Sequence, residues 1–241
     1  MQHPRPQKVG LYRDLSFAIF TMACLVFPAI SVADSASGIV RVIGFTDQSH
    51  GSAVEWLKEN GWNFRLDAEA LNPRFTEKGL VLSTEQRTAG LIERRLRLSD
   101  VGRIRITWGV DDYPKGADWE NGVYRVPIAV MISFGEEDIG SGSLFVPNTP
   151  YFISLFLSKN AQPGKAYTAK YYQKGGRYFC TPCTPPEGKT VITEFDLDDA
   201  FRDQFGKSDV PAITSFGIQM NTKDTRGGAR AHLERIEFIA R

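Results

Sequence analysis

The chain has 241 residues, with 29 Lys and Arg against 28 Asp and Glu and only 3 His, so its formal net charge is +1. A nucleic-acid-binding protein normally carries a basic excess, and this balance disfavours that class. The scarcity of histidine also limits the acid–base and metal chemistry that the chain can support.

The first 33 residues are typical of a secretory signal peptide. The basic residues Arg5, Lys8 and Arg13 precede an apolar run of 14 residues at 17–30, and small residues follow up to Ala33. This order marks a cleaved export signal, and the run is shorter than the roughly 20 residues of a membrane-spanning helix. We therefore expect cleavage near Ala33 and a periplasmic or secreted mature protein.

Two alternatives stay open for this segment. It could be an uncleaved N-terminal anchor, or a lipoprotein signal acylated at Cys24, although Thr21 stands where such signals carry leucine. Processing would leave residues 34–241, with 26 basic and 27 acidic residues. A chain of this length fits one domain, and no second long apolar stretch predicts a stable membrane span.

The mature chain reads as a series of strands separated by Gly, Pro, Asn and Asp. Period-2 alternation of apolar side chains is the pattern of a half-buried strand. The predicted strands are residues 39–46, 79–83, 92–98, 103–110, 124–134, 151–157, 167–172, 190–195, 216–220 and 229–240.

Two local features of these strands are predicted. Residues 99–102 look like a short turn, so the strands on either side of it should form a hairpin. The last strand changes phase, with Ala231 and Leu233 on one face but Ile236 and Phe238 on the other. Since a one-residue slip reverses the buried face, we expect a β-bulge near Glu234-Arg235.

One helix is well marked, because Asp196 can cap its N-terminus, Leu197, Phe201 and Phe205 share one stripe, and Gly206 can end it. Residues 53–60 predict a second, shorter helix. Many strands with few helices indicate an all-β protein. We predict a jelly-roll-like β-sandwich of mostly antiparallel strands in residues 34–241.

Three stretches, residues 79–110, 194–206 and 213–238, together resemble a family of exported bacterial proteins catalogued as domain of unknown function three-zero-four-seven. The likeness spans about two-thirds of the mature chain. The resemblance implies a jelly-roll fold of the carbohydrate-binding kind and brings no established activity.

The sequence Cys180-Thr181-Pro182-Cys183 holds both cysteines of the mature chain. Outside the cytoplasm such a pair tends to oxidise, so we favour a structural disulfide that closes a loop. A redox site would place the motif at a helix start, and Pro185-Pro186 prevents a regular helix there. Zinc would need further ligands that the chain does not pair with it. Free thiols are the remaining alternative.

Catalytic motifs are missing from the sequence, including HExxH, GxSxG and a glycine-rich phosphate loop. His50 and His232 are the histidines of the mature chain, and we interpret each as a surface or strand residue. We predict no catalytic residue, metal or cofactor. A pair of carboxylates could still act on polysaccharide, because their separation in space is not visible in a sequence.

Two groups of side chains could bind a ligand. If the hairpin forms, Arg95, Arg97, Arg103 and Arg105 gather and could grip a carboxylate, sulfate or phosphate, although a solvated sheet face is the simpler interpretation. The loop with Asp112, Tyr113, Asp118, Trp119 and Tyr124 puts aromatic rings beside acids, which suits stacking against sugars, although aromatic clusters commonly fill a core.

The function most consistent with these features is non-catalytic binding of a glycan or another cell-envelope component. An enzyme using paired carboxylates on polysaccharide and a structural protein-docking domain are the alternatives. We expect no nucleic-acid partner, and the sequence does not identify a protein partner.

Overall fold

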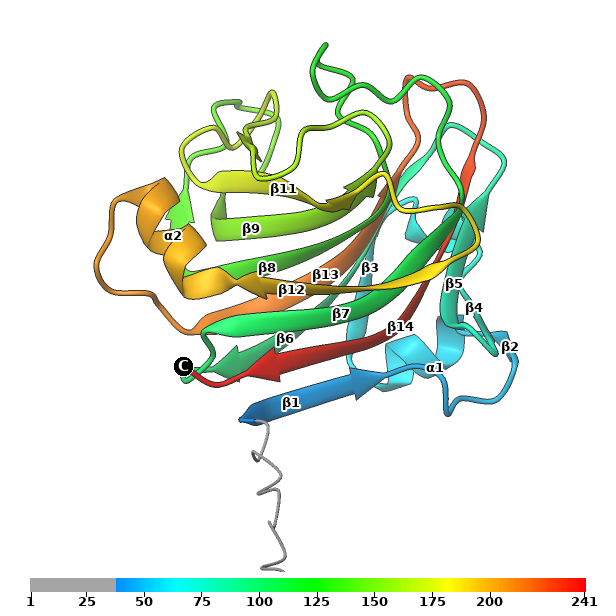
Figure 1. Cartoon of the computed structure of the whole chain (residues 1–241), viewed down its shortest axis with the longest axis horizontal. Helices are drawn as coiled ribbons and strands as arrows, with labels where there is room; N and C mark the ends of the chain where they lie inside the picture. Colours follow the sequence, from blue (N-terminus) through cyan, green and yellow to red (C-terminus); the bar gives the residue numbers. More distant parts are fainter. Residues whose placement is uncertain (1–37) are drawn as a thin grey trace, which may run out of the picture. The chain divides into compact units, whose positions relative to one another are not determined.

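Two β-sheets face each other across a shared apolar core in the computed structural model, which describes residues 38–241 (Figure 1). The predicted signal peptide, residues 1–33, lies outside the described residues. Buried side chains alternate with less buried ones along part of β7, whereas most of β8 and β9 is buried on both faces. The predicted fold class, a mostly antiparallel β-sandwich with two short helices, is confirmed.

Each sheet has seven strands within the described residues. The β14 sheet runs in the order β12 (Thr190–Asp196), β7 (Arg103–Asp112), β14 (Ala229–Ile239), β5 (Gly79–Thr84), β4 (Arg74–Thr76) and β2 (Gly51–Ser52), with β1 (Ile39–Gly44) also paired to β14. The β9 sheet runs in the order β10 (Ala166–Tyr167), β11 (Gly176–Cys183), β9 (Thr149–Ser158), β8 (Val126–Ile139), β13 (Ile213–Asn221), β6 (Ala89–Leu98) and β3 (Trp62–Leu66). Strands β9 and β11 pair in parallel, and the other pairs are antiparallel.

The predicted hairpin is wrong. Strand β6 pairs with β13 and β3, whereas β7 pairs with β12 and β14, so the two strands lie in different sheets. The link between them crosses from one layer to the other. Val101 is buried in the core, and the Gly102 amide donates to the Ile239 carbonyl. A short link between two half-buried strands can cross to the opposite sheet instead of forming a hairpin turn within one sheet.

The predicted β-bulge is confirmed. The register of β14 against β7 shifts between Leu233 and Arg235. Before the bulge, β14 pairs with β5 along one edge, and after it the same edge pairs with β1. The phase change therefore keeps apolar side chains of both halves inside the sandwich.

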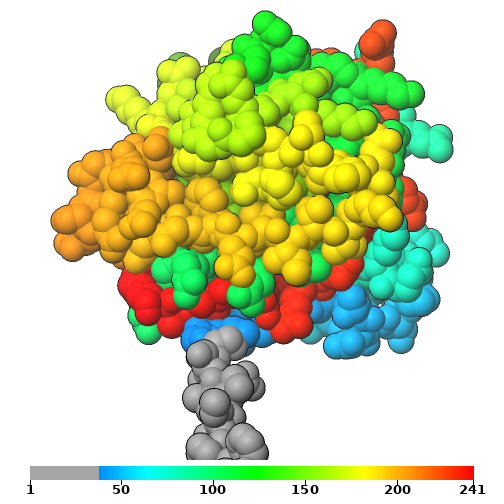
Figure 2. Space-filling view, viewed as in Figure 1, coloured from blue at the N-terminus to red at the C-terminus, as the bar shows by residue number. Residues whose placement is uncertain are grey.

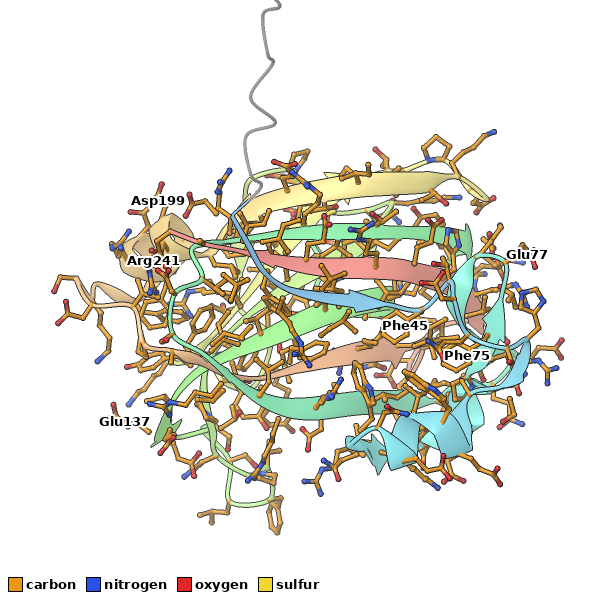
Figure 3. The ribbon with its side chains drawn as sticks, turned by 90° about the horizontal axis from the view of Figure 1, so that it is seen from below. Phe45, Phe75, Glu77, Glu137, Asp199 and Arg241 are labelled. Atoms are coloured by element: carbon orange, nitrogen blue, oxygen red, sulfur yellow. A yellow bond between two sulfur atoms is a disulfide. The ribbon has the colours of Figure 1, made fainter. Side chains whose placement is uncertain are left out.

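Both predicted helices form. The α2 helix (Leu197–Phe205) begins where the Asp196 side chain accepts a hydrogen bond from the Asp199 amide, and it ends at Gly206 with φ 64°. The shorter α1 (Val54–Glu59) and a 3₁₀ turn, η1 (Ala68–Leu71), lie in the N-terminal part. Beside them Phe45 and Phe75 point toward each other, with ring centroids 6.4 Å apart (Figure 3).

The cysteine segment differs from its prediction as a loop. It forms the end of β11, whereas the strand expected at residues 167–172 is reduced to the two residues of β10. Figure 2 shows the yellow atoms around β12 and the segment before it covering this side of the molecule above β14. Thr193 of β12 donates to the Thr181 carbonyl at 2.8 Å, which joins the two sheets here.

Candidate functional site

The loop between β7 and β8 is folded against the outer face of the β9 sheet. Asp118 and Val123 form an isolated β-bridge at its base. The Trp119 ring stacks on Phe156 with centroids 4.1 Å apart and planes inclined by 20°, and its Nε1 donates to the Arg125 carbonyl at 3.1 Å. Because Phe156 points away from the main core, these rings form a second apolar cluster on the opposite face.

Trp119 is therefore not an exposed stacking platform, and that expectation is wrong. Its exposed fraction is 3%, and Tyr124, Tyr167 and Tyr178 all lie with ring centroids within 5.4 Å of it. Its sequence neighbours Glu120 and Asn121 are exposed, although the ring itself is buried. The indole closes the second cluster instead of presenting its face to solvent.

The polar neighbours of Trp119 hold the loop in place. Asp118 accepts hydrogen bonds from the Asn121 side chain at 2.8 Å and from its amide at 3.2 Å, and these lower the pKa of the Asp118 carboxyl. Glu120 accepts from Lys165 at 2.8 Å and from the Tyr167 hydroxyl. Their hydrogen-bonding capacity is already partly used within the protein.

An open pocket lies beside this loop. It has a volume of about 180 Å³, below the roughly 300 to 1,000 Å³ of pockets for drug-sized ligands. Of the predicted ligand-binding residues, it brings together Asp112 and Tyr113, whereas Asp118, Trp119 and Tyr124 do not line it. Its other walls come from the same loop, from the adjoining start of β8, from the end of β9 with the loop that follows it, and from the loop before β12: Pro114, Lys115, Gly116, Ala117, Arg125, Pro127, Ser158, Lys159, Asn160 and Glu187.

Tyr113 forms the aromatic wall of the pocket. Its hydroxyl donates to the Pro185 carbonyl at 3.0 Å, and its exposed fraction is 7%. Burial raises the pKa of the Tyr113 hydroxyl, and the Glu187 carboxylate adds to the shift. Lys159 lies with Nζ 4.8 Å from the ring centroid and 2.7 Å from Glu187 Oε1. The ring is fixed in place, with a cation over one face.

Hydrogen bonds join the loops around the pocket. Asn160 donates from Nδ2 to the Ala117 carbonyl at 3.1 Å, and its own carbonyl accepts from the Trp119 amide at 3.2 Å. Arg125 donates from Nε to the Lys223 carbonyl at 2.5 Å and forms an ion pair with Asp224. These bonds tie the segments after β7, β9 and β13 together, so the pocket is largely preformed.

Sequence reasoning missed most of these walls. Arg125, Lys159, Asn160 and Glu187 come from segments separated by up to 62 positions. One signal was available, because the polar run Ser158-Lys159-Asn160 directly follows an apolar strand. Polar residues at strand ends are where binding loops are commonly built.

The predicted arginine cluster does not form. Arg95 and Arg97 are exposed on β6 of the β9 sheet, whereas Arg103 and Arg105 are on β7 of the β14 sheet. Arg97 pairs with Glu136 at 2.8 Å, and Arg105 pairs with Glu194 at 2.6 Å and Glu237 at 3.2 Å. The cluster depended on the hairpin and is lost with it.

The predicted disulfide between Cys180 and Cys183 is present. It borders a second, mostly apolar groove with Pro163, Gly164, Phe179, Thr181, Pro182 and Phe195. Residues 38–241 contain no group of three or more His, Cys, Asp or Glu side chains placed to hold a metal ion. In the same part of the chain, no helix is both long and apolar enough to cross a membrane.

His232 is buried outside the pocket, on β14. Its Nε2 lies 3.0 Å from Thr190 Oγ1, and its Nδ1 lies 3.7 Å from Asp111 Oδ1. Gly109 on β7 leaves room for the ring, since a Cβ there would stand 2.4 Å from His232 Cε1. Burial lowers the pKa of His232, although the Asp111 charge opposes part of this effect.

No family model and no curated protein sequence matches the chain. Among solved structures, the K2 cleaved adhesin domain of Lys-gingipain is 13% identical with a TM-score of 0.37, over 82% of this chain and 98% of that one. Two structures of the Emp46p carbohydrate recognition domain, a mutant and a potassium-bound form, are 10% and 8% identical with TM-scores of 0.41. They cover 81% of this chain and 93% and 94% of their own. At these identities the likenesses concern the fold alone.

Proposed function

We propose that the mature chain is a non-catalytic binding domain and that the pocket beside Tyr113 receives one sugar unit of a glycan. The observation that carries the proposal is the composition of this preformed pocket. The Tyr113 ring lines the pocket together with carboxylate, amide, hydroxyl and cationic groups, and hydrogen bonds hold the loops that carry them. Such groups pair with sugar hydroxyls, while the apolar part of the lining, Tyr113 with Pro114 and Pro127, borders the C–H surface.

An array of immobilised glycans probed with the mature protein tests this function. Asp112 is exposed and lines the pocket, so Asp112→Ala should weaken binding to any glycan retained on the array. Asp199→Ala is the matched control, because Asp199 is also exposed but lies on α2, at the other end of β12 (Figure 3). Equal binding by both variants, or no retained glycan, would overturn the proposal.

The pocket also keeps an enzymatic alternative open, because it contains two carboxylates, Asp112 and Glu187. Glycoside hydrolysis needs one carboxyl group to donate a proton. Glu187 already accepts a hydrogen bond from Lys159 within an ion pair, an arrangement better suited to holding a hydroxyl. A reducing-sugar release assay on the glycans that bind separates the two functions, since only an enzyme would produce new ends.

A different surface supports a protein-docking function. Leu144 and Phe145 are 100% and 96% exposed in the loop between β8 and β9. This loop projects from the body below the labelled Glu137 in Figure 3. Co-purification of a partner that is lost with Phe145→Ser, while glycan binding is unchanged, would support this function.

Export is part of the proposal. The order of charged, apolar and small residues in the first 33 positions supports cleavage near Ala33, with a periplasmic or secreted product. Mass spectrometry of the exported protein should find an N-terminus at Asp34 or within a few residues of it. An intact Met1 on a membrane-bound product would contradict this localisation.

A further inference from the structure

One rim of the pocket brings two cations together through the backbone. The turn between β13 and β14 crosses the segment after β7, where the Arg226 amide donates to the Lys115 carbonyl at 2.8 Å. The two residues form an isolated antiparallel bridge, and both are exposed. Lys115 also lines the pocket. The bridge therefore places two basic residues directly opposite each other, Lys115 in the pocket lining and Arg226 next to it.

Two of the three acids near this rim have cationic partners. Asp224, in the same turn, is paired with Arg125, and Glu187 across the pocket is paired with Lys159. Asp112 has no such partner in the described part of the chain, because Arg230, opposite it in the β7–β14 register, pairs with Asp111 at 3.4 Å. Among residues 38–241, no carboxylate forms an ion pair with Lys115, Lys223 or Arg226.

Like charges on directly opposed residues of paired strands destabilise the pairing. An anion seated between Lys115 and Arg226 would remove this repulsion, and a guanidinium binds carboxylate or sulfate through two parallel hydrogen bonds. The positive charge is local, because the mature chain as a whole has 26 basic and 27 acidic residues.

We propose that the ligand of this pocket is an acidic glycan whose carboxylate or sulfate group lies between Lys115 and Arg226. This inference rests on the proposed glycan-binding function and narrows it to one chemical class. The remaining pocket groups bind the hydroxyls of the same sugar unit, and Tyr113 bounds its apolar face.

The test uses the mature protein and an array of oligosaccharides that carry uronate carboxylates, sulfate esters or neither group. Oligogalacturonate and its methyl ester are one matched pair, since esterification removes the charge and keeps the sugar. Titration calorimetry then gives the dissociation constant for the tightest member of each class. We expect acidic members to bind at least tenfold more tightly than neutral ones, with affinity falling as salt increases. The preferred acidic class identifies the anion as carboxylate or sulfate.

The double variant Lys115→Gln/Arg226→Gln should lose at least tenfold in affinity for the acidic ligand and remove most of its salt dependence. Lys170→Gln/Lys174→Gln is the matched control, because it removes two exposed cations from the loop beyond the other end of β9. If the Lys115→Gln/Arg226→Gln variant does not fold, its thermal unfolding will show no cooperative transition. The salt dependence of binding by the unaltered protein then tests the proposal.

The outcomes separate the two proposals. If neutral glycans bind as tightly as acidic ones, the acidic class is wrong and glycan binding stands. If the double variant binds the acidic ligand like the unaltered protein, the anion does not lie between Lys115 and Arg226, and the proposal is wrong in its site. If no glycan of any class binds, the proposed function fails and this inference fails with it.

Discussion

The Trp108 indole donates a hydrogen bond of 2.9 Å from Nε1 to the hydroxyl of Thr193, and both side chains are buried. The same hydroxyl donates to the Thr181 carbonyl at 2.8 Å. Trp108 lies on β7, Thr193 on β12 and Thr181 on β11, so this chain of bonds connects the β14 sheet to the β9 sheet. A core tryptophan thus helps to fix the edge where the two sheets meet.

Removing the Thr193 hydroxyl should lower the free energy of unfolding by more than the small size of the group suggests. Thr193→Val keeps the shape of the side chain but leaves the Trp108 N–H and the Thr181 carbonyl without their partner. An unsatisfied buried polar group costs about 1–3 kcal/mol, and Trp108→Ala should cost roughly 3–5 kcal/mol through the cavity that it opens. Urea unfolding of the two variants measures both values. A Thr193→Val protein as stable as the parent would show that the bond contributes nothing.

Trp119 should behave as a structural residue. Because its ring is buried against Phe156, Trp119→Ala should destabilise the protein by roughly 3–5 kcal/mol, the usual cost of truncating a buried tryptophan. The exposed Tyr171 is the control, and Tyr171→Ala should change the midpoint of thermal unfolding little. Unchanged thermal unfolding of Trp119→Ala would contradict the packing described here.

The disulfide between Cys180 and Cys183 should be a small stabilising element. It spans a sequence separation of 3, so the entropy that it removes from the unfolded chain is below the roughly 3 kcal/mol expected for a 15-residue loop. Thiol titration of the denatured mature protein without reductant should find no free sulfhydryl, and the double Ala variant should unfold at slightly lower urea. Insulin-reducing activity above background would instead indicate a redox site.

His232 should make stability depend on pH. Its folded pKa is lowered below the unfolded value of about 6.5, so the unfolded chain binds the proton more tightly. The folded state is therefore favoured fully above that pH, and stability falls as the pH decreases from about 6.5 toward the folded pKa. Burial is the main cause, and the charges of Asp111, Lys78, Glu234 and Arg230 modify it.

Proton NMR of the mature protein can measure this directly, because the expected product 34–241 contains two histidines, His50 and His232. The His232 ring should titrate below pH 6.5, and a His232→Gln variant identifies its signals by their loss. A His232 ring that titrates above pH 6.5 would reverse the sign of the predicted stability change.

The sequence predicted the strands and the helix cap better than it predicted which strands pair with one another. Local patterns located the α2 cap at Asp196 and the bulge before Arg235, since each depends on residues that are adjacent in the chain. Which sheet a strand joins depends on distant partners, and so the link at residues 99–102 was interpreted as a hairpin.

The candidate site was predicted only in part, for a related reason. Asp112 and Tyr113 were predicted because an aromatic ring stands beside an acid in the sequence at this loop, and both line the pocket. Trp119 was misplaced because a sequence does not show that the outer face of a sheet carries its own apolar cluster. The remaining pocket walls meet only after three separate loops, those after β7, β9 and β11, have folded together.

The pairing of β1 with β14 means that the first strand of the sandwich waits for the last strand before it can pair. The bulge before Arg235 leaves the second half of β14 for β1, and these strands join residues near 40 to residues near 238. The edge of the β14 sheet is therefore completed only after residues 229–239 have been synthesised. Long-range pairing of this kind slows folding, which fits the proposed export, because a slowly closing sandwich would cross a membrane unfolded.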